Sequence, residues 1–299
     1  MSDPAPTFLP GRLERDVVLG SLVRHSVPGV ERVDLASGTV TRLVGGTTSP
    51  AGSTPGRAPV PLTVAVREDG VQVHGPATPA TLDAVREWFD LDTDVEAVHE
   101  AFRDDTVLGP LVRRRPALRV IGHPDAFEAA AQTVLGQQVS LAACRTFTGR
   151  LAAAYGWAGE DGLTTFPDAP TVAAADQEEL RAAIGIPAAR ARTVIALAEA
   201  FASGLRVERG ADQAEVRERL LALPGIGPWT ADYLALRVLR DPDAYPVGDL
   251  VLRRALGGIS PAAALEYGQR WRPWRAYATM HLWTADAEGS AVNGVSSGA

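Results

Sequence analysis

The 299 residues leave room for one large domain or for two to three modest ones with a real core. The chain has no twenty-residue apolar run, and it begins with a polar, proline-rich segment. We therefore expect a cytoplasmic protein without a membrane span or a signal peptide. The single cysteine, Cys144, excludes an internal disulfide and a four-cysteine iron–sulfur cluster.

The net charge of −7 at first argues against a polyanionic partner. The negative charge is local, however, because residues 1–105 hold nine arginines against 16 acidic residues. Residues 106–299 hold 20 of each kind, so this neutral part can still bind phosphates, with strong salt dependence. All 29 basic residues are arginines, which removes the chemistry of a lysine Schiff base.

The N-terminal third combines helical and strand-like patterns. We expect disorder over residues 1–12, a helix over 14–23 and a second helix over 78–89. Short alternating segments between the two helices predict strands over 30–35, 40–44, 62–66 and 71–73, and a mobile loop rich in Gly, Pro, Ser and Thr joins the second strand to the third. This order predicts a small antiparallel sheet with helices, an α+β domain over residues 13–105.

The rest of the chain has an apolar period typical of helices. Residues 92–115 form a connecting helical region that ends in Arg113–Arg115, either a solvated helix end or a phosphate contact. The predicted helices then cover 124–135, 141–155, 178–184, 188–202, 214–222, 228–239, 250–256, 261–271 and 274–288. We therefore expect an all-α domain over residues 106–288 and a disordered tail over 289–299.

A glycine hairpin between two of these helices is the most informative stretch. Residues 223–233 read Leu-Pro-Gly-Ile-Gly-Pro-Trp-Thr-Ala-Asp-Tyr, in which the glycines allow a tight turn and Pro228 suits a first helical position. Such a turn exposes backbone N–H groups beside the positive end of the second helix, and this suits one phosphate, with Gly225, Ile226, Gly227 and Thr230 as the candidate contacts. The alternative is an ordinary corner between two helices.

All eleven of these residues fit the pattern L-P-G-[IV]-G-x-x-T-A-x-[YF]. On this motif the chain resembles the helix-hairpin-helix (hairpin–Gly/Pro–Asp, HhH-GPD) superfamily of DNA glycosylases, and within it the 3-methyladenine DNA glycosylase II family. The resemblance implies that Asp249, which follows Trp229 by 20 residues, is the catalytic carboxylate. A helix N-cap is the alternative role for this aspartate, and the two roles can coexist. Where lyase-type relatives carry the reactive lysine, this chain has Trp229.

An alkylated purine is cationic and already a good leaving group, so the enzyme must extract it, hold it and stabilise the sugar cation. Electron-rich aromatic faces hold a cation, and Trp229 and Tyr233 share one helix face. The resemblance adds Trp283 to this base pocket. Core packing is the alternative for each aromatic residue, and we expect it for Trp271 and Trp274.

The resemblance also implies roles for residues 135–140, Leu-Gly-Gln-Gln-Val-Ser, with Gln137 near the base pocket and Gln138 as the wedge that fills the gap in the DNA. A polar loop between helices is the alternative. Backbone carbonyls of Leu221, Leu223 and Ile226 are candidates for an optional structural Na⁺ or K⁺, and no cofactor is required. Gly248 and Leu250 depart from the aspartate and tyrosine of some relatives.

These features predict a monofunctional DNA glycosylase of base excision repair, which removes N-alkylated purines of the 3-methyladenine type and leaves an abasic site without lyase activity. Its expected partner is double-stranded DNA. We expect a monomeric, nucleoid-associated bacterial protein that works beside an alkyltransferase or an abasic-site endonuclease. The alternatives are a uracil or mismatch glycosylase and a non-catalytic DNA-binding protein.

Overall fold

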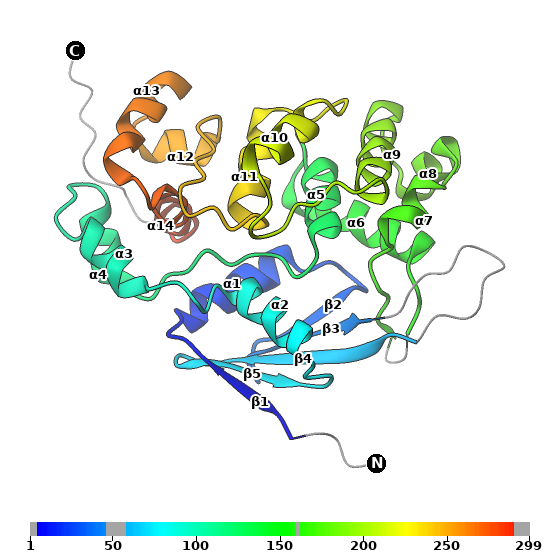
Figure 1. The fold of residues 1–299 in the computed structure, drawn as a ribbon, viewed down its shortest axis with the longest axis horizontal. Helices are drawn as coiled ribbons and strands as arrows, with labels where there is room; N and C mark the ends of the chain where they lie inside the picture. The colour runs from blue at the N-terminus through cyan, green and yellow to red at the C-terminus, as the bar shows by residue number, and fades with distance from the viewer. Residues whose placement is uncertain (1–4, 46–57, 160–161, 290–299) are drawn as a thin grey trace.

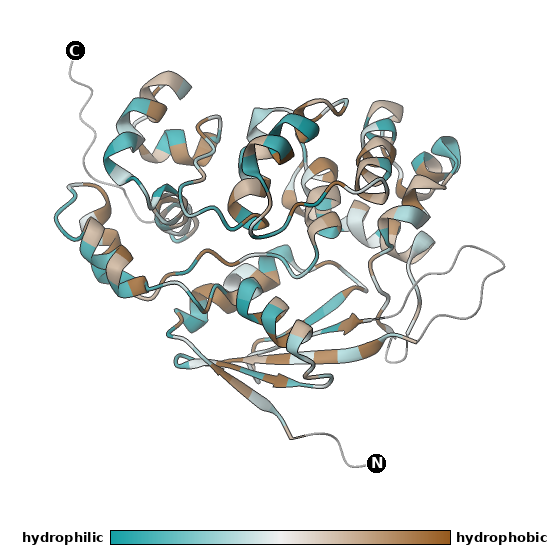
Figure 2. Cartoon of the chain, viewed as in Figure 1, coloured by the Kyte–Doolittle hydropathy of each residue, from teal (hydrophilic) through white to brown (hydrophobic). Residues whose placement is uncertain are grey.

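The computed structural model describes residues 5–45, 58–159 and 162–289. It has an N-terminal antiparallel sheet beneath a larger assembly of helices, as the sequence predicts (Figure 1). The loop expected over residues 45–61 lies largely outside the described residues, as do residues 290–299 of the expected tail. Figure 2 shows hydrophilic and hydrophobic residues together on most helices, which is the distribution expected when each helix buries one side.

The sheet has five strands in the order β1-β5-β4-β3-β2, all antiparallel. Their bounds are Thr7–Pro10 (β1), Glu31–Asp34 (β2), Thr39–Val44 (β3), Val60–Val66 (β4) and Gly70–His74 (β5). Helices α1 (Arg15–His25) and α2 (Pro79–Phe89) bury Leu19, Leu22 and Phe89 against the same core as Val64 and Val71. α1 thus lies between the sheet and the helical part (Figure 1).

Strand β1 corrects the expectation of disorder over residues 1–12. Its residues pair with β5, with Leu9 opposite Val71 and Pro10 opposite Gly70, and Leu9 is buried. Four residues bounded by prolines are too short to show a strand pattern, and this edge strand is stabilised by its long-range partner. Residues 1–4 lie outside the described part of the chain.

The nine helices expected after residue 124 are all present, with ends within two residues of the prediction except where a helix closes as a 3₁₀ turn. They are α5 (Ala126–Leu135), α6 (Leu141–Tyr155), α8 (Gln177–Ile184), α9 (Ala188–Ala202), α10 (Gln213–Leu221), α11 (Pro228–Arg237), α12 (Leu250–Ala255), α13 (Pro261–Tyr267) with the 3₁₀ turn η2 (Gly268–Trp271), and α14 (Arg275–Ala287). A short helix, α7 (Ala169–Ala173), was not predicted.

The helical part has two cores, and α11 belongs to both. Ala231 and Leu234 of α11 pack among α5 to α10, whereas Leu236 packs among α12 to α14. The connecting helices α3 (Val95–Phe102) and α4 (Leu108–Arg114) join the second core, so the domain limit near residue 105 stays a prediction. The face of α11 between the two cores is therefore the place where a site can be built from both.

Buried polar contacts fix the sheet domain to the helices. Arg42 of β3 forms an ion pair with Glu128 of α5, and both side chains are almost fully buried. Asp90, which follows α2, pairs with Arg240 at 2.9 Å and accepts a hydrogen bond from the Tyr277 hydroxyl at 2.7 Å. Breaking a buried pair by removing one partner costs about 3–5 kcal/mol. These contacts fix the sheet domain, on whose core α1 packs, against the helical part.

Candidate active site

The hairpin between α10 and α11 has the conformation that its glycines predict. Gly225 has a φ of +78°, and a Cβ atom there would lie 2.4 Å from the Thr193 hydroxyl oxygen. Gly227 is the N-cap of α11, and a Cβ atom there would meet nothing within 4 Å. The first N–H groups of a helix have no intrahelical acceptor, so this open approach suits a phosphate oxygen.

Gln137 supports the hairpin from the side, and its predicted place in the base pocket stays a prediction. Its amide group donates to the Gly225 carbonyl at 3.0 Å and to the Thr230 hydroxyl at 3.2 Å. Arg190 in turn donates to the Gln137 carbonyl at 2.6 Å. Gln137 is not among the residues that line the large cavity described below. A turn carbonyl that faces protein needs a donor, and the amide side chain supplies it.

Thr230 takes part in the same contact. This residue is 2% exposed and its hydroxyl accepts the hydrogen bond from Gln137, so its predicted phosphate contact stays a prediction. Ile226 is buried, and its N–H donates to the Leu223 carbonyl at 3.2 Å to close the turn. The hairpin surface open to a phosphate is therefore the backbone around Gly227.

The cation predicted at the carbonyls of Leu221, Leu223 and Ile226 stays a prediction. These oxygens are donors of the kind that hard cations accept. The Leu223 carbonyl already accepts the Ile226 N–H, but a carbonyl has two lone pairs and can also face a cation. Such an ion would hold the turn in shape.

Gln138 occupies the corner between α5 and α6 in a left-handed conformation, with a φ of +56°, and its side chain is exposed. A non-glycine residue with this φ is uncommon and costs free energy, so such residues gather at functional sites. This placement is compatible with the predicted role as a DNA wedge.

Asp249 is held by three donors. It caps α12, where one carboxylate oxygen (Oδ1) accepts the Leu252 N–H at 2.9 Å. The same oxygen accepts the indole N–H of Trp283 at 2.9 Å, and the other oxygen (Oδ2) accepts the indole N–H of Trp229 at 3.1 Å. Asp249 is thus both the N-cap of α12 and the candidate catalytic residue. The three N–H groups that donate to its carboxylate fix the orientation of the side chain.

The three predicted pocket aromatics form one wall beside this carboxylate. The rings of Trp229 and Tyr233 stack with centroids 5.2 Å apart and an interplanar angle of 24°. The Trp283 ring lies 6.0 Å from that of Tyr233 at 36°. All three side chains are half-buried, so part of each ring stays available to a ligand. By contrast, Trp271 is buried in the core and donates to Asp105, which confirms its packing role.

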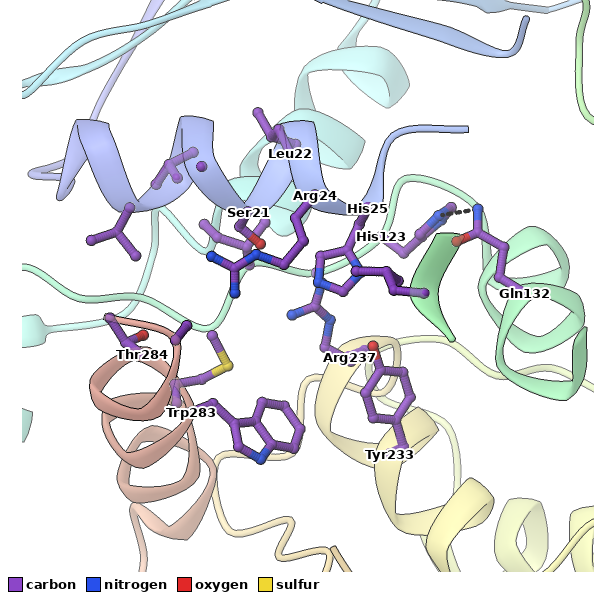
Figure 3. Close-up of a pocket in the computed structure, with 18 of the residues that line it drawn as sticks. Ser21, Leu22, Arg24, His25, His123, Gln132, Tyr233, Arg237, Trp283 and Thr284 are labelled. Carbon is purple, nitrogen blue, oxygen red and sulfur yellow. Dashed lines mark hydrogen bonds between the residues drawn. The ribbon is translucent and has the colours of Figure 1, made fainter. Parts of the chain in front are cut away.

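The aromatic wall borders a cavity of about 760 Å³ that also reaches α1 of the sheet domain. Figure 3 shows Tyr233 and Trp283 on one side of this cavity and Arg24 and His25 of α1 on the other. Arg237 lines it as well, one turn beyond Tyr233 on α11. Burial and the nearby charges of Arg237 and Arg24 lower the pKa of His25 to about 3, so its imidazole is neutral.

Sequence reasoning missed these cavity residues from α1, because only the fold brings that helix to the site. Arg237 could have been found from the sequence, since residues 229, 233 and 237 repeat at a spacing of four along one helix face.

The run Arg113–Arg115 lies at the C-terminal end of α4. Arg115 forms ion pairs with Glu14, Asp16 and Glu288, and Arg114 also pairs with Glu288, so these contacts favour a structural role.

Comparison with known proteins identifies the family. Residues 131–264 match the HhH-GPD superfamily of base excision DNA repair proteins, and residues 12–125 match the AlkA N-terminal domain. A solved 3-methyladenine DNA glycosylase from Archaeoglobus fulgidus has the same fold, with a TM-score of 0.79 over 96% of this chain and 100% of that one, at 21% identity.

Sequence relatives narrow the assignment. DNA-3-methyladenine glycosylase 2 of Escherichia coli is 38% identical over 198 residues, which are 65% of this chain and 68% of that protein. A probable bifunctional transcriptional activator/DNA repair enzyme AlkA of Mycobacterium tuberculosis is 45% identical over 208 residues, 67% of this chain. The match spans only 41% of the length of that relative. The chain belongs to the HhH-GPD superfamily and is similar to its 3-methyladenine glycosylases.

None of the helices in the described ranges is long and apolar enough to cross a membrane.

Proposed function

We propose that this protein is a monofunctional DNA glycosylase that everts N-alkylated purines from double-stranded DNA and hydrolyses their N-glycosidic bond. The observation that carries the proposal is the Asp249 carboxylate, which two indole N–H groups and a helix N-terminus hold at the edge of an aromatic cavity. Its relatives in sequence are named as 3-methyladenine glycosylases.

The site residues have different roles in this proposal. The hairpin backbone around Gly227 binds a phosphate and sets the register of the duplex. Gln138 fills the space that the everted nucleotide leaves. Trp229, Tyr233 and Trp283 offer aromatic faces to the cationic base, each worth about 0.5–2 kcal/mol.

Asp249 acts on the sugar. An alkylated purine leaves as a neutral base, so the positive charge that develops as the bond breaks lies on the deoxyribose. A fixed carboxylate stabilises that charge and accepts a proton from the attacking water. Because the carboxylate is already oriented by its three donors, little reorganisation is required as the charge develops.

We expect no lyase activity because of the composition of the chain. Strand cleavage by a glycosylase uses an amine that forms a Schiff base with the sugar, and the chain contains no lysine. A duplex with one defined abasic site is expected to stay intact, and borohydride is expected to trap no protein–DNA adduct. Strand cleavage by the purified protein would contradict this part of the proposal.

The experiment that tests the proposed function compares three duplexes that carry alkylated purines, uracil or no lesion. We expect release of alkylated purines and little release of uracil, because a neutral pyrimidine gains less from the aromatic wall. Preferred release of uracil would support a uracil glycosylase. Tight binding to all three duplexes without base release would support a non-catalytic DNA-binding protein.

A further inference from the structure

Two arginines from different domains converge in the cavity. Arg24 comes from the last turn of α1, and Arg237 comes from α11, one turn beyond Tyr233. Figure 3 shows both guanidinium groups pointing into the space between α1 and the aromatic wall. The Arg237 guanidinium carbon lies 5.9 Å from the centre of the Tyr233 ring, so it borders the surface on which a base would stack.

These two arginines differ from the other arginines of the cavity wall. Arg115 pairs with three carboxylates, Arg119 donates to the carbonyls of Arg12 and Thr93, and Arg145 donates to Ser26. Among the described residues, Arg24 and Arg237 have neither an ion pair nor a hydrogen bond through their side chains. Their donors are therefore available to a ligand.

Carboxylates such as those of Glu31 and Asp249 also line the cavity, but no carboxylate of the described residues forms an ion pair with Arg24 or Arg237. Figure 3 shows His25 on the same side of the cavity as Arg24, and its imidazole is neutral, since its pKa is about 3. Small residues, Gly20 and Ser21, also line the cavity from α1. The part of the cavity beside α1 thus combines open space with several N–H donors. A guanidinium group can only donate hydrogen bonds, so these groups require acceptors on a ligand.

This inference rests on the proposed function. We infer that Arg24 and Arg237 are specificity-determining residues that favour guanine-type lesions over adenine-type lesions. The two types differ beside N7, where guanine has the acceptor O6 and adenine has an amino group. A guanine-type lesion offers O6 and N7, to which an arginine can donate two parallel bonds. An adenine-type lesion offers N7 but places an amino donor where O6 would be, so donor faces donor.

Charge alone does not make this choice. Both 3-methylguanine and 3-methyladenine are cationic in DNA, so the arginines repel both to a similar extent. The two lesions share the site of alkylation and the leaving nitrogen, and they differ in the groups around the purine ring. They therefore form a matched pair for the hydrogen-bonding role.

The test is an internal competition on one methylated duplex that contains both lesions. Released bases are separated by chromatography, and the ratio of 3-methylguanine to 3-methyladenine gives the ratio of their kcat/KM values. Arg237→Met and Arg24→Met are expected to lower this ratio relative to the unaltered protein, by about tenfold for Arg237→Met. Arg237→Lys keeps the charge but loses the bidentate hydrogen-bonding geometry, so we expect it to retain only part of the preference for 3-methylguanine.

Arg206→Met is the matched control. Arg206 is exposed, lies before α10 begins and does not line the cavity. This variant removes the same charge and is expected to keep the ratio unchanged. An unchanged ratio in both cavity variants, or full retention in Arg237→Lys, would overturn the inference. If the unaltered protein releases neither base, the proposed function itself fails, which is a separate result.

Discussion

The indole N–H of Trp283 donates to the Asp249 carboxylate at 2.9 Å and so joins the last helix to the N-cap of α12. The two residues are 34 positions apart, and neither needs the other to form its own helix. Trp283 thus combines two functions, since its ring faces the cavity while its N–H orients the acid.

Trp283→Phe separates these functions. The variant keeps an aromatic face but removes the donor, and a hydrogen bond to a charged group contributes about 1.5–3 kcal/mol. We expect kcat for release of an alkylated purine to fall by about tenfold or more, with a smaller change in KM. Single-turnover kinetics measure this. Trp274→Phe, the same change at a tryptophan outside the cavity, is the control. An equal loss in both variants would argue against an orienting role for the indole.

The two hairpin glycines are expected to respond differently to alanine. Gly225→Ala puts a Cβ atom 2.4 Å from the Thr193 hydroxyl at a φ of +78°, so thermal unfolding should show a loss of about 1 kcal/mol or more. Gly227→Ala meets open space and should fold with nearly unchanged stability. Its methyl group nevertheless stands where a phosphate would approach, and we expect weaker duplex binding. Undiminished binding by Gly227→Ala would remove the hairpin from the DNA interface.

Stability should fall in mild acid because of buried histidines. His281 of α14 is 4% exposed, and burial lowers its pKa from 6.5 to about 3. The unfolded chain therefore binds a proton below about pH 6.5 that the folded chain does not, and stability is lost as the pH falls from there toward 3. His281→Met removes this contribution of up to about 1.4 kcal/mol per pH unit. Urea unfolding at pH 7 and pH 5 should show a smaller loss for the variant than for the parent. Equal losses would mean that His281 is not a source of the pH dependence.

Local signals explain why the helices and the main site residues were predictable. The hairpin, its first helical proline and the N-cap position of Asp249 each depend on a few neighbouring residues, and the structure places them as expected. The aromatic wall follows from a spacing of four on α11 together with a family resemblance at Trp283. Strand β1 was not predicted, because its order comes from pairing with residues 60 to 66 positions away.

Side-chain contacts between distant segments could not be predicted from the sequence. Gln137 and Thr230 were assigned to the pocket and the phosphate by position, yet the two residues bond to each other. Their partners come from segments 93 positions apart, which no local pattern reveals. The same holds for Arg24, which reaches the cavity only because α1 packs between the sheet and the helices.

The central claim is that the Asp249 carboxylate stabilises the sugar as the base departs, and Asp249→Asn tests it most directly. Asparagine is also a good N-cap, so α12 and the hairpin should stay in place. Single-turnover release of an alkylated purine and binding to the same duplex are measured on both proteins. The account predicts at least about a hundredfold slower release with unchanged binding. Release at the parental rate would contradict it.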